Sequence, residues 1–153
     1  MPLNHLSRFI NGICAICFFV LILSSSCFAG DIIAVIVNKG NSVDFLSESD
    51  IRRIYTNNML EWADGAPITI YDLSLQDNLR AGFSEKILGK PPYQVAEEWA
   101  HLKINNQAKN PPVTVKSQTI VIRKVSLERG AIGYVSAGAV KDNPAVKIVR
   151  TIQ

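Results

Sequence analysis

The sequence predicts an α/β fold in which a mixed or mostly parallel sheet is flanked by helices. Short runs of β-branched apolar residues alternate with segments whose apolar residues recur every three or four positions. No internal repeat, low-complexity tract or linker divides the chain. About 124 residues follow position 29, which is a usual size for one domain with a packed core.

The first 29 residues have the features of a secretion signal. Arg8 supplies a positive charge, and the apolar stretch Ile13–Leu23 is too short to span a bilayer comfortably. Cleavage after Ala29 satisfies the small-x-small rule. The alternative is a lipoprotein site at Cys27, but Ser24 stands where such sites usually carry a large aliphatic residue. We therefore expect an exported domain at residues 30–153.

Cysteine and charge usage exclude several kinds of site in the exported chain. The three cysteines all precede residue 30, so we expect no disulfide and no thiolate metal site. The net charge is small and positive, and the densest basic cluster is the pair Arg52-Arg53. We therefore expect no nucleic-acid partner and no membrane insertion after signal cleavage.

The first strand and helix are predicted from apolar patterning and a capping residue. Asp31–Asn38 is a nearly continuous β-branched run, which is typical of a strand buried on both faces. Ser47 is placed as an N-cap, with Asp50 at the third helical position. The buried stripe of this helix is expected to comprise Ile51, Ile54 and Tyr55.

A second strand is expected at Ile68–Tyr71, after the turn Ala63–Gly65. Ser74 can cap the helix that follows, because Asp77 stands three residues further on. Gly89 is a natural left-handed terminator for this helix. Its apolar residues recur every four positions, at Leu75, Leu79, Phe83 and Ile87.

Pro92 is expected to open a third helix, since proline at the first helical position loses no hydrogen bond. Asn105–Pro112 is polar, ends in two prolines and predicts a loop. Further strands are expected at Ala131–Val135 and Val146–Thr151. The buried face of the third helix would comprise Val95, Trp99 and Leu102.

The segment Val113–Arg129 is ambiguous from its residues alone. Thr119–Ile122 is β-branched and has strand propensity. Ser117 as a cap and Gly130 as a stop favour a helix instead.

We expect no catalytic residue, no metal site and no cofactor. His101 is the single histidine of the exported chain, and it falls off the buried face of the third helix. Glu97 and Glu98 point about 100° apart on that helix, so they converge poorly as an acid–base pair. The chain has no histidine pair at zinc spacing and no glycine-rich phosphate loop.

A ligand-binding turn is the candidate functional site. In open α/β folds, ligands bind beyond the carboxyl ends of strands, where helix amides are free. The segment after Tyr71 has this arrangement. Helix capping alone is the competing explanation for the turn, and an ion pair with Asp77 is the competing role for Arg80. The candidate binding residues are Asp72, Ser74, Gln76, Asn78 and Arg80.

Three landmarks in a fixed order suggest a family. LSESDIRRIY begins at Leu46, EWADG spans Glu61–Gly65 and RGAIGYV spans Arg129–Val135. Together they resemble the second lobe of phosphate-type ABC-transporter substrate-binding proteins, of the type II periplasmic binding protein superfamily. They are most similar to small secreted proteins built from that lobe. The resemblance covers Ile32–Val149, and it implies that the ambiguous segment is a helix from about Gln118 to Glu128.

The resemblance implies a non-catalytic periplasmic protein with a single lobe of a two-lobed clamp. Proteins of this family carry, after the equivalent strand, an arginine followed four residues later by Ser-Gly-Thr, which grip an oxyanion. Here Asp72 stands at the arginine, and Gln76, Asp77 and Asn78 stand at Ser-Gly-Thr. This departure argues against ordinary phosphate binding at the turn.

Two functions are expected from these observations. The first is a solute-binding protein for phosphate, another small anion or a polar solute. The second is a degenerate lobe that serves as a protein-interaction or regulatory module, for example for an envelope sensor or a transporter.

Overall fold

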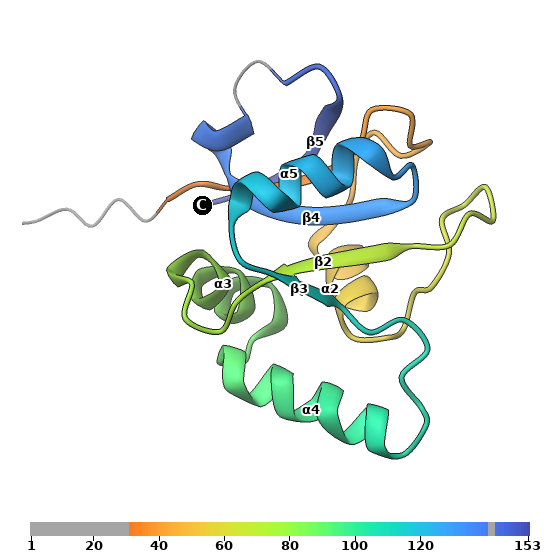
Figure 1. Ribbon diagram of the computed structural model, residues 1–153, viewed down its shortest axis with the longest axis vertical. Helices are drawn as coiled ribbons and strands as arrows, with labels where there is room; N and C mark the ends of the chain where they lie inside the picture. The colour runs from red at the N-terminus through yellow and green to blue at the C-terminus, as the bar shows by residue number, and fades with distance from the viewer. Residues whose placement is uncertain (1–30, 141–142) are drawn as a thin grey trace, which may run out of the picture.

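The computed structural model describes residues 31–140 and 143–153, so the predicted signal sequence lies outside the described residues. Within them, five strands form one sheet in the order β3-β2-β4-β1-β5 (Figure 1). β2 runs parallel to β3 and β4, whereas β1 is antiparallel to β4 and β5. The predicted α/β fold with a mixed sheet is therefore confirmed. The strands are β1 (Ile33–Asn38), β2 (Thr69–Leu73), β3 (Val113–Val115), β4 (Ala131–Ser136) and β5 (Val146–Ile152).

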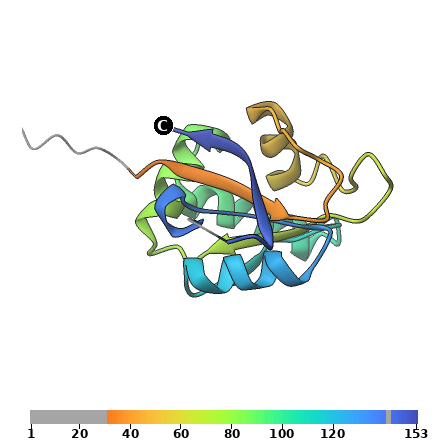
Figure 2. The ribbon, with the colours of Figure 1, turned by 90° about the horizontal axis from the view of Figure 1, so that it is seen from above.

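Helices cover both faces of the sheet (Figure 2). β4 shows the division, because neighbouring residues of a strand point to opposite faces. Gly133 lies against Val121 of α5, and Tyr134 stacks on Phe83 of α3. The helices are α2 (Glu48–Tyr55), α3 (Asn78–Phe83), the π-helix η1 (Ser84–Leu88), α4 (Pro92–Ile104), α5 (Gln118–Leu127) and the 3-10 helix η2 (Ala137–Val140).

Capping residues predict three helix starts correctly. Ser47 Oγ accepts a hydrogen bond from the Asp50 amide at 3.1 Å, and Pro92 is the first residue of α4. Ser117 caps α5, so the ambiguous segment is helical from Gln118 to Leu127. The structure adds β3, which the sequence did not predict. β3 has three residues, and its first two are exposed, so it lacks a long apolar run.

The helix predicted to start after Ser74 begins later. Asp77 is the N-cap of α3, with its carboxylate accepting from the Leu79 amide at 2.9 Å. The Ser74 carbonyl instead accepts from the Asp77 amide in a turn, and Leu75, the first of the four periodic apolar residues, is 46% exposed. The predicted terminator is confirmed, since Gly89 adopts a left-handed φ of 68°.

α4 packs beside the β3 edge of the sheet (Figure 1). Val95 and Trp99 are buried as predicted, and the Trp99 indole N–H donates to the Tyr55 carbonyl at 3.2 Å. Leu102 is only half-buried. Within residues 31–140 and 143–153, no helix combines the length and apolar character that a bilayer-spanning segment requires.

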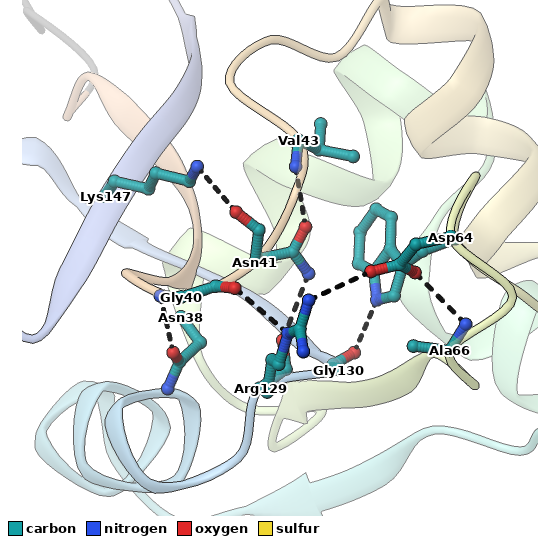
Figure 3. A network of polar contacts seen from close by, with 10 residues as sticks. Asn38, Gly40, Asn41, Val43, Asp64, Ala66, Arg129, Gly130 and Lys147 are labelled. Atoms are coloured by element: carbon teal, nitrogen blue, oxygen red, sulfur yellow. Dashed lines mark hydrogen bonds and ion pairs between the residues drawn. The ribbon is translucent and has the colours of Figure 1, made fainter.

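Two of the sequence landmarks meet at the amino-terminal ends of β2 and β4 (Figure 3). Trp62 donates its indole N–H to the Gly130 carbonyl at 2.9 Å, and Arg129 pairs with Asp64 at 3.3 Å. Asn41 donates to the Arg129 carbonyl at 3.1 Å. We call these five residues the loop cluster. It fastens the loop after β1 and the turn before β2 to the start of β4.

Candidate functional site

Asp72 lies near the carboxyl end of β2 and is buried in an ion pair. Its side chain is 8% exposed, and that of Arg80 in α3 is 7% exposed. Arg80 Nη2 lies 2.9 Å from Asp72 Oδ2. Arg80 therefore pairs with Asp72 rather than with Asp77, which caps α3. The pair forms because α3 starts at Asn78, and this start directs the Arg80 side chain back toward β2.

Further hydrogen bonds hold both members of this pair. Asp72 Oδ1 accepts from the Tyr134 hydroxyl and from the Leu73 amide, the latter at 2.9 Å. Arg80 Nη1 donates to the Leu73 carbonyl at 2.5 Å. Burial of a polar group costs free energy unless the group forms a hydrogen bond or an ion pair. These contacts therefore offset the cost of burying Asp72 and Arg80.

Aromatic rings close the inner side of the ion pair. Tyr134 and Phe83 are stacked with ring centroids 3.9 Å apart, and Tyr55 lies 4.8 Å from Phe83. Burial raises the pKa of the Asp72 carboxyl, although Arg80 and the Tyr134 hydroxyl act in the opposite direction. Burial, together with the negative charge of Asp72, also raises the pKa of Tyr134 above its ordinary value.

A pocket of about 350 Å³ lies on the outer side of the pair, between the carboxyl end of β2, strand β3 and helix α4. This volume falls in the range of small-molecule sites. Its polar lining comprises Asp72, Ser74, Gln76, Arg80, Lys103 and Thr114. Its apolar lining comprises Leu75, Ala96, Trp99, Ala100 and Pro112.

Four of the five candidate residues line this one pocket. They are Asp72, Ser74, Gln76 and Arg80, whereas Asn78 is exposed at the first position of α3 and lies outside the lining. Whether any of them binds a ligand stays a prediction. Their shared position follows from the short distance along the chain between the end of β2 and the start of α3.

The opposite wall of the pocket was not identified from the sequence. The sequence predicts a packing role for Trp99 and assigns no role to Lys103 or Thr114. Thr114 reaches the site because β3 pairs with β2 in parallel, with Thr114 opposite Asp72. The one available signal was the spacing of Ala96, Ala100 and Lys103, which places small residues and a cation on one face of a helix.

The carboxylate that lines the pocket is already engaged by other side chains. Asp72 is held by Arg80 and Tyr134, so its carboxylate is not free to act as a general base. His101 is exposed and does not line the pocket. In the described part of the chain, no cluster of three or more His, Cys, Asp or Glu side chains is arranged to hold a metal ion.

Comparison with known sequences and with solved structures gives different results. No protein-family model matches the sequence, and no curated protein sequence matches it either. Solved structures do match. A protein from Clostridium perfringens, assigned as a phosphate ABC transporter substrate-binding protein and solved with bound phosphate, has 25% identity and a TM-score of 0.63. The match covers 78% of this chain and 44% of that protein.

Two further solved structures show the same fold. An ABC-type phosphate transport receptor from Vibrio cholerae has 19% identity and a TM-score of 0.61, over 78% of this chain and 46% of its own. PstS from Borrelia burgdorferi has 21% identity and a TM-score of 0.62, with the same coverage. This chain spans less than half the length of these proteins. It therefore has the fold of a single lobe of a phosphate ABC-transporter substrate-binding protein.

Proposed function

We propose that this chain is a non-catalytic periplasmic solute-binding protein whose ligand is phosphate or another small anion. The observation that carries the proposal is the pocket beside Arg80 and Lys103, at the carboxyl end of β2. Ligands of open α/β folds bind at this edge. The likeness in fold to substrate-binding proteins, one of them solved with phosphate, supports the same function.

The proposed location depends on the amino-terminal segment. We propose that residues 1–29 are a signal peptide and that residues 30–153 form one binding domain in the periplasm. Mass spectrometry of the mature protein tests this proposal. A chain beginning at Gly30 agrees with it, whereas a lipid-modified Cys27 would mean an anchored lipoprotein.

A second function is favoured by the Asp72–Arg80 pair. Asp72 already occupies the guanidinium of Arg80, which is the buried cation of the pocket. A lobe whose cation is neutralised in this way could have lost solute binding and kept a surface for a protein partner. This alternative is an interaction or regulatory module for an envelope sensor or transporter.

A thermal-shift screen of the purified protein separates the two functions. The screen uses phosphate, sulfate, small organic acids and amino acids. A ligand at 100 times its Kd adds about 2.7 kcal/mol to the free energy of unfolding, which moves the midpoint by several degrees. A saturable shift with an anion supports solute binding. A flat screen on a cooperatively folded protein contradicts it and favours the interaction module.

A further inference from the structure

The cations of the pocket are not equally free to bind a ligand. Arg80 donates to Asp72 at 2.9 Å and to the Leu73 carbonyl at 2.5 Å, and its side chain is 7% exposed. A ligand anion would have to displace the Asp72 carboxylate to reach the same guanidinium face. The Asp72 carboxylate therefore already neutralises the Arg80 guanidinium, and the pair together carries no net charge.

Lys103 is the cation that remains. It lies in the last turn of α4, is exposed, lines the pocket and makes no ion pair with the described residues. With Asp72 and Arg80 cancelling each other, the charged side chains lining the pocket sum to one positive charge. One negative charge on a ligand balances it, because a second would face no further cation in the lining.

The apolar wall determines what that ligand must carry besides its charge. Trp99 donates its indole N–H to the Tyr55 carbonyl, so it offers the pocket no free donor. Ala96 and Ala100 add small apolar surfaces beside it, and Leu75 is 46% exposed at the other side of the opening. Binding is stabilised when an apolar group of the ligand covers such a surface, whereas a fully hydrated inorganic anion gains no stabilisation from it.

The neutral polar residues of the pocket do not distinguish an organic carboxylate from inorganic phosphate. Ser74, Gln76 and Thr114 can each donate hydrogen bonds to a carboxylate or to a phosphate. The preference for one anion over another therefore depends on Lys103, which is unpaired among the described residues, and on the apolar wall.

We propose that the pocket selects a small organic monocarboxylate with an apolar body over inorganic phosphate. Lys103 pairs with the carboxylate, and the apolar body lies against Trp99, Ala96 and Ala100. This proposal rests on the proposed function, since it names the class of anion that the same pocket binds.

Calorimetric titration of the purified protein with four probes tests the proposal. The probes are benzoate, hexanoate, the neutral analogue benzamide, and inorganic phosphate. We expect benzoate or hexanoate to bind at least about tenfold more tightly than phosphate, a difference of about 1.4 kcal/mol. We expect benzamide to bind about tenfold more weakly than benzoate, because it lacks the charge that Lys103 recognises.

Two variants and one control locate the binding. Lys103→Met keeps an apolar stem and removes the charge, so it should weaken benzoate binding about tenfold and leave benzamide binding unchanged. Ala100→Trp should abolish benzoate binding by filling the pocket, and it should fold normally because Ala100 is exposed. The matched control is Lys124→Met, on α5 at the other face of the sheet, which should bind benzoate as the parent does.

The outcomes separate this inference from the proposed function. Phosphate binding that depends on Lys103, with weaker benzoate binding, overturns the inference and leaves anion binding in place. Benzoate affinity that is unchanged in both Lys103→Met and Ala100→Trp also overturns it, because the ligand would then bind elsewhere. Failure of benzoate, hexanoate and phosphate to bind at millimolar concentration, together with a flat thermal-shift screen, overturns the proposed function, and the inference with it.

Discussion

The two ends of β2 use polar side chains in different ways. At its amino-terminal end, the loop cluster bonds mostly to backbone carbonyls, as Trp62 does to Gly130 and Asn41 does to Arg129 (Figure 3). At its carboxyl end, Asp72 and Arg80 are buried and are satisfied by each other. The first end holds loops in place, and the second forms the wall of a pocket.

This difference explains why the fold is easier to recognise than the ligand. EWADG and RGAIGYV supply four of the five residues of the loop cluster, whose contacts depend on backbone position and would be needed whatever the protein binds. The pocket end has different requirements, since a change of ligand changes the charges that its wall must carry. The landmarks at the amino-terminal end of β2 therefore indicate the fold. The identity of the ligand must be inferred from the residues at its carboxyl end.

The largest expected effect comes from breaking the buried pair. Asp72→Ala leaves Arg80 buried without a counter-charge, so we expect the free energy of unfolding to fall by about 3–5 kcal/mol. Urea unfolding measures this change. The double variant Asp72→Leu/Arg80→Met should recover most of the loss, because replacing a buried pair with apolar residues is often neutral.

The control for this experiment is an exposed ion pair. Glu98 pairs with Lys90, and both side chains are more than a third exposed. Glu98→Ala should therefore cost at most about 1 kcal/mol. A loss of similar size in Asp72→Ala would mean that the pocket end is no more dependent on its charges than the open surface.

The second effect tests the backbone geometry of the loop cluster. A Cβ added at Gly130 would lie 2.2 Å from the Pro67 carbonyl oxygen, and a backbone atom cannot move aside as a side chain can. We expect Gly130→Ala to destabilise the protein by about 1–3 kcal/mol, measured by urea unfolding. Anion binding in the pocket should be unaffected at temperatures where the variant is folded.

Gly82 provides a matched control on α3. A Cβ there would make an ordinary contact with Ile33 at 3.6 Å. Alanine is also a better helix former than glycine, so Gly82→Ala should be neutral or stabilise by up to about 1 kcal/mol. Equal destabilisation by both variants would show that the loop cluster places no special demand on position 130.

The sequence-based predictions are correct where the interactions are local along the chain, and they fail where distant segments interact. Ser47 and Pro92 start helices through contacts within one turn, so the sequence predicts them correctly. Ser117 starts α5 in the same way, but the strand propensity of Thr119–Ile122 left that segment ambiguous from its residues alone. Ser74 and Asp77 are both good capping residues, and local signals alone do not choose between them. The structure has Asp77 as the cap, and this start turns Arg80 toward Asp72, an interaction that no local pattern encodes.

The candidate site divides in the same way. Asp72, Ser74, Gln76 and Arg80 lie within nine positions of one another, so a strand followed by a turn was enough to group them. Lys103 and Thr114 join them only through the packing of α4 and the parallel pairing of β3 with β2. Both depend on contacts between distant segments, which a single sequence does not reveal.

The smallest effects are expected from pH, and they should have opposite signs at the two ends. Burial raises the pKa of Asp72, so the folded protein holds a proton there at pH values where the unfolded chain does not. The part of its contribution to stability that depends on this proton is fully present below its ordinary pKa of 3.8 and is lost as pH rises through the raised value. The Ala66 amide lowers the pKa of Asp64, assisted by Ser42 and Arg129. The contribution of Asp64 is present above 3.8 and is lost as pH falls through the lowered value.

Unfolding midpoints of the parent, Asp64→Asn and Asp72→Asn between about pH 3 and pH 6 test this contrast. The stability of the parent relative to Asp72→Asn should decrease as pH rises above 3.8. Its stability relative to Asp64→Asn should increase as pH rises toward 3.8 and then stay constant. Asparagine keeps the shape of each side chain and cannot titrate, so each difference isolates one carboxyl group. Two differences with the same slope would mean that the Arg80 guanidinium outweighs burial at Asp72, and that both ends of β2 favour a charged carboxylate.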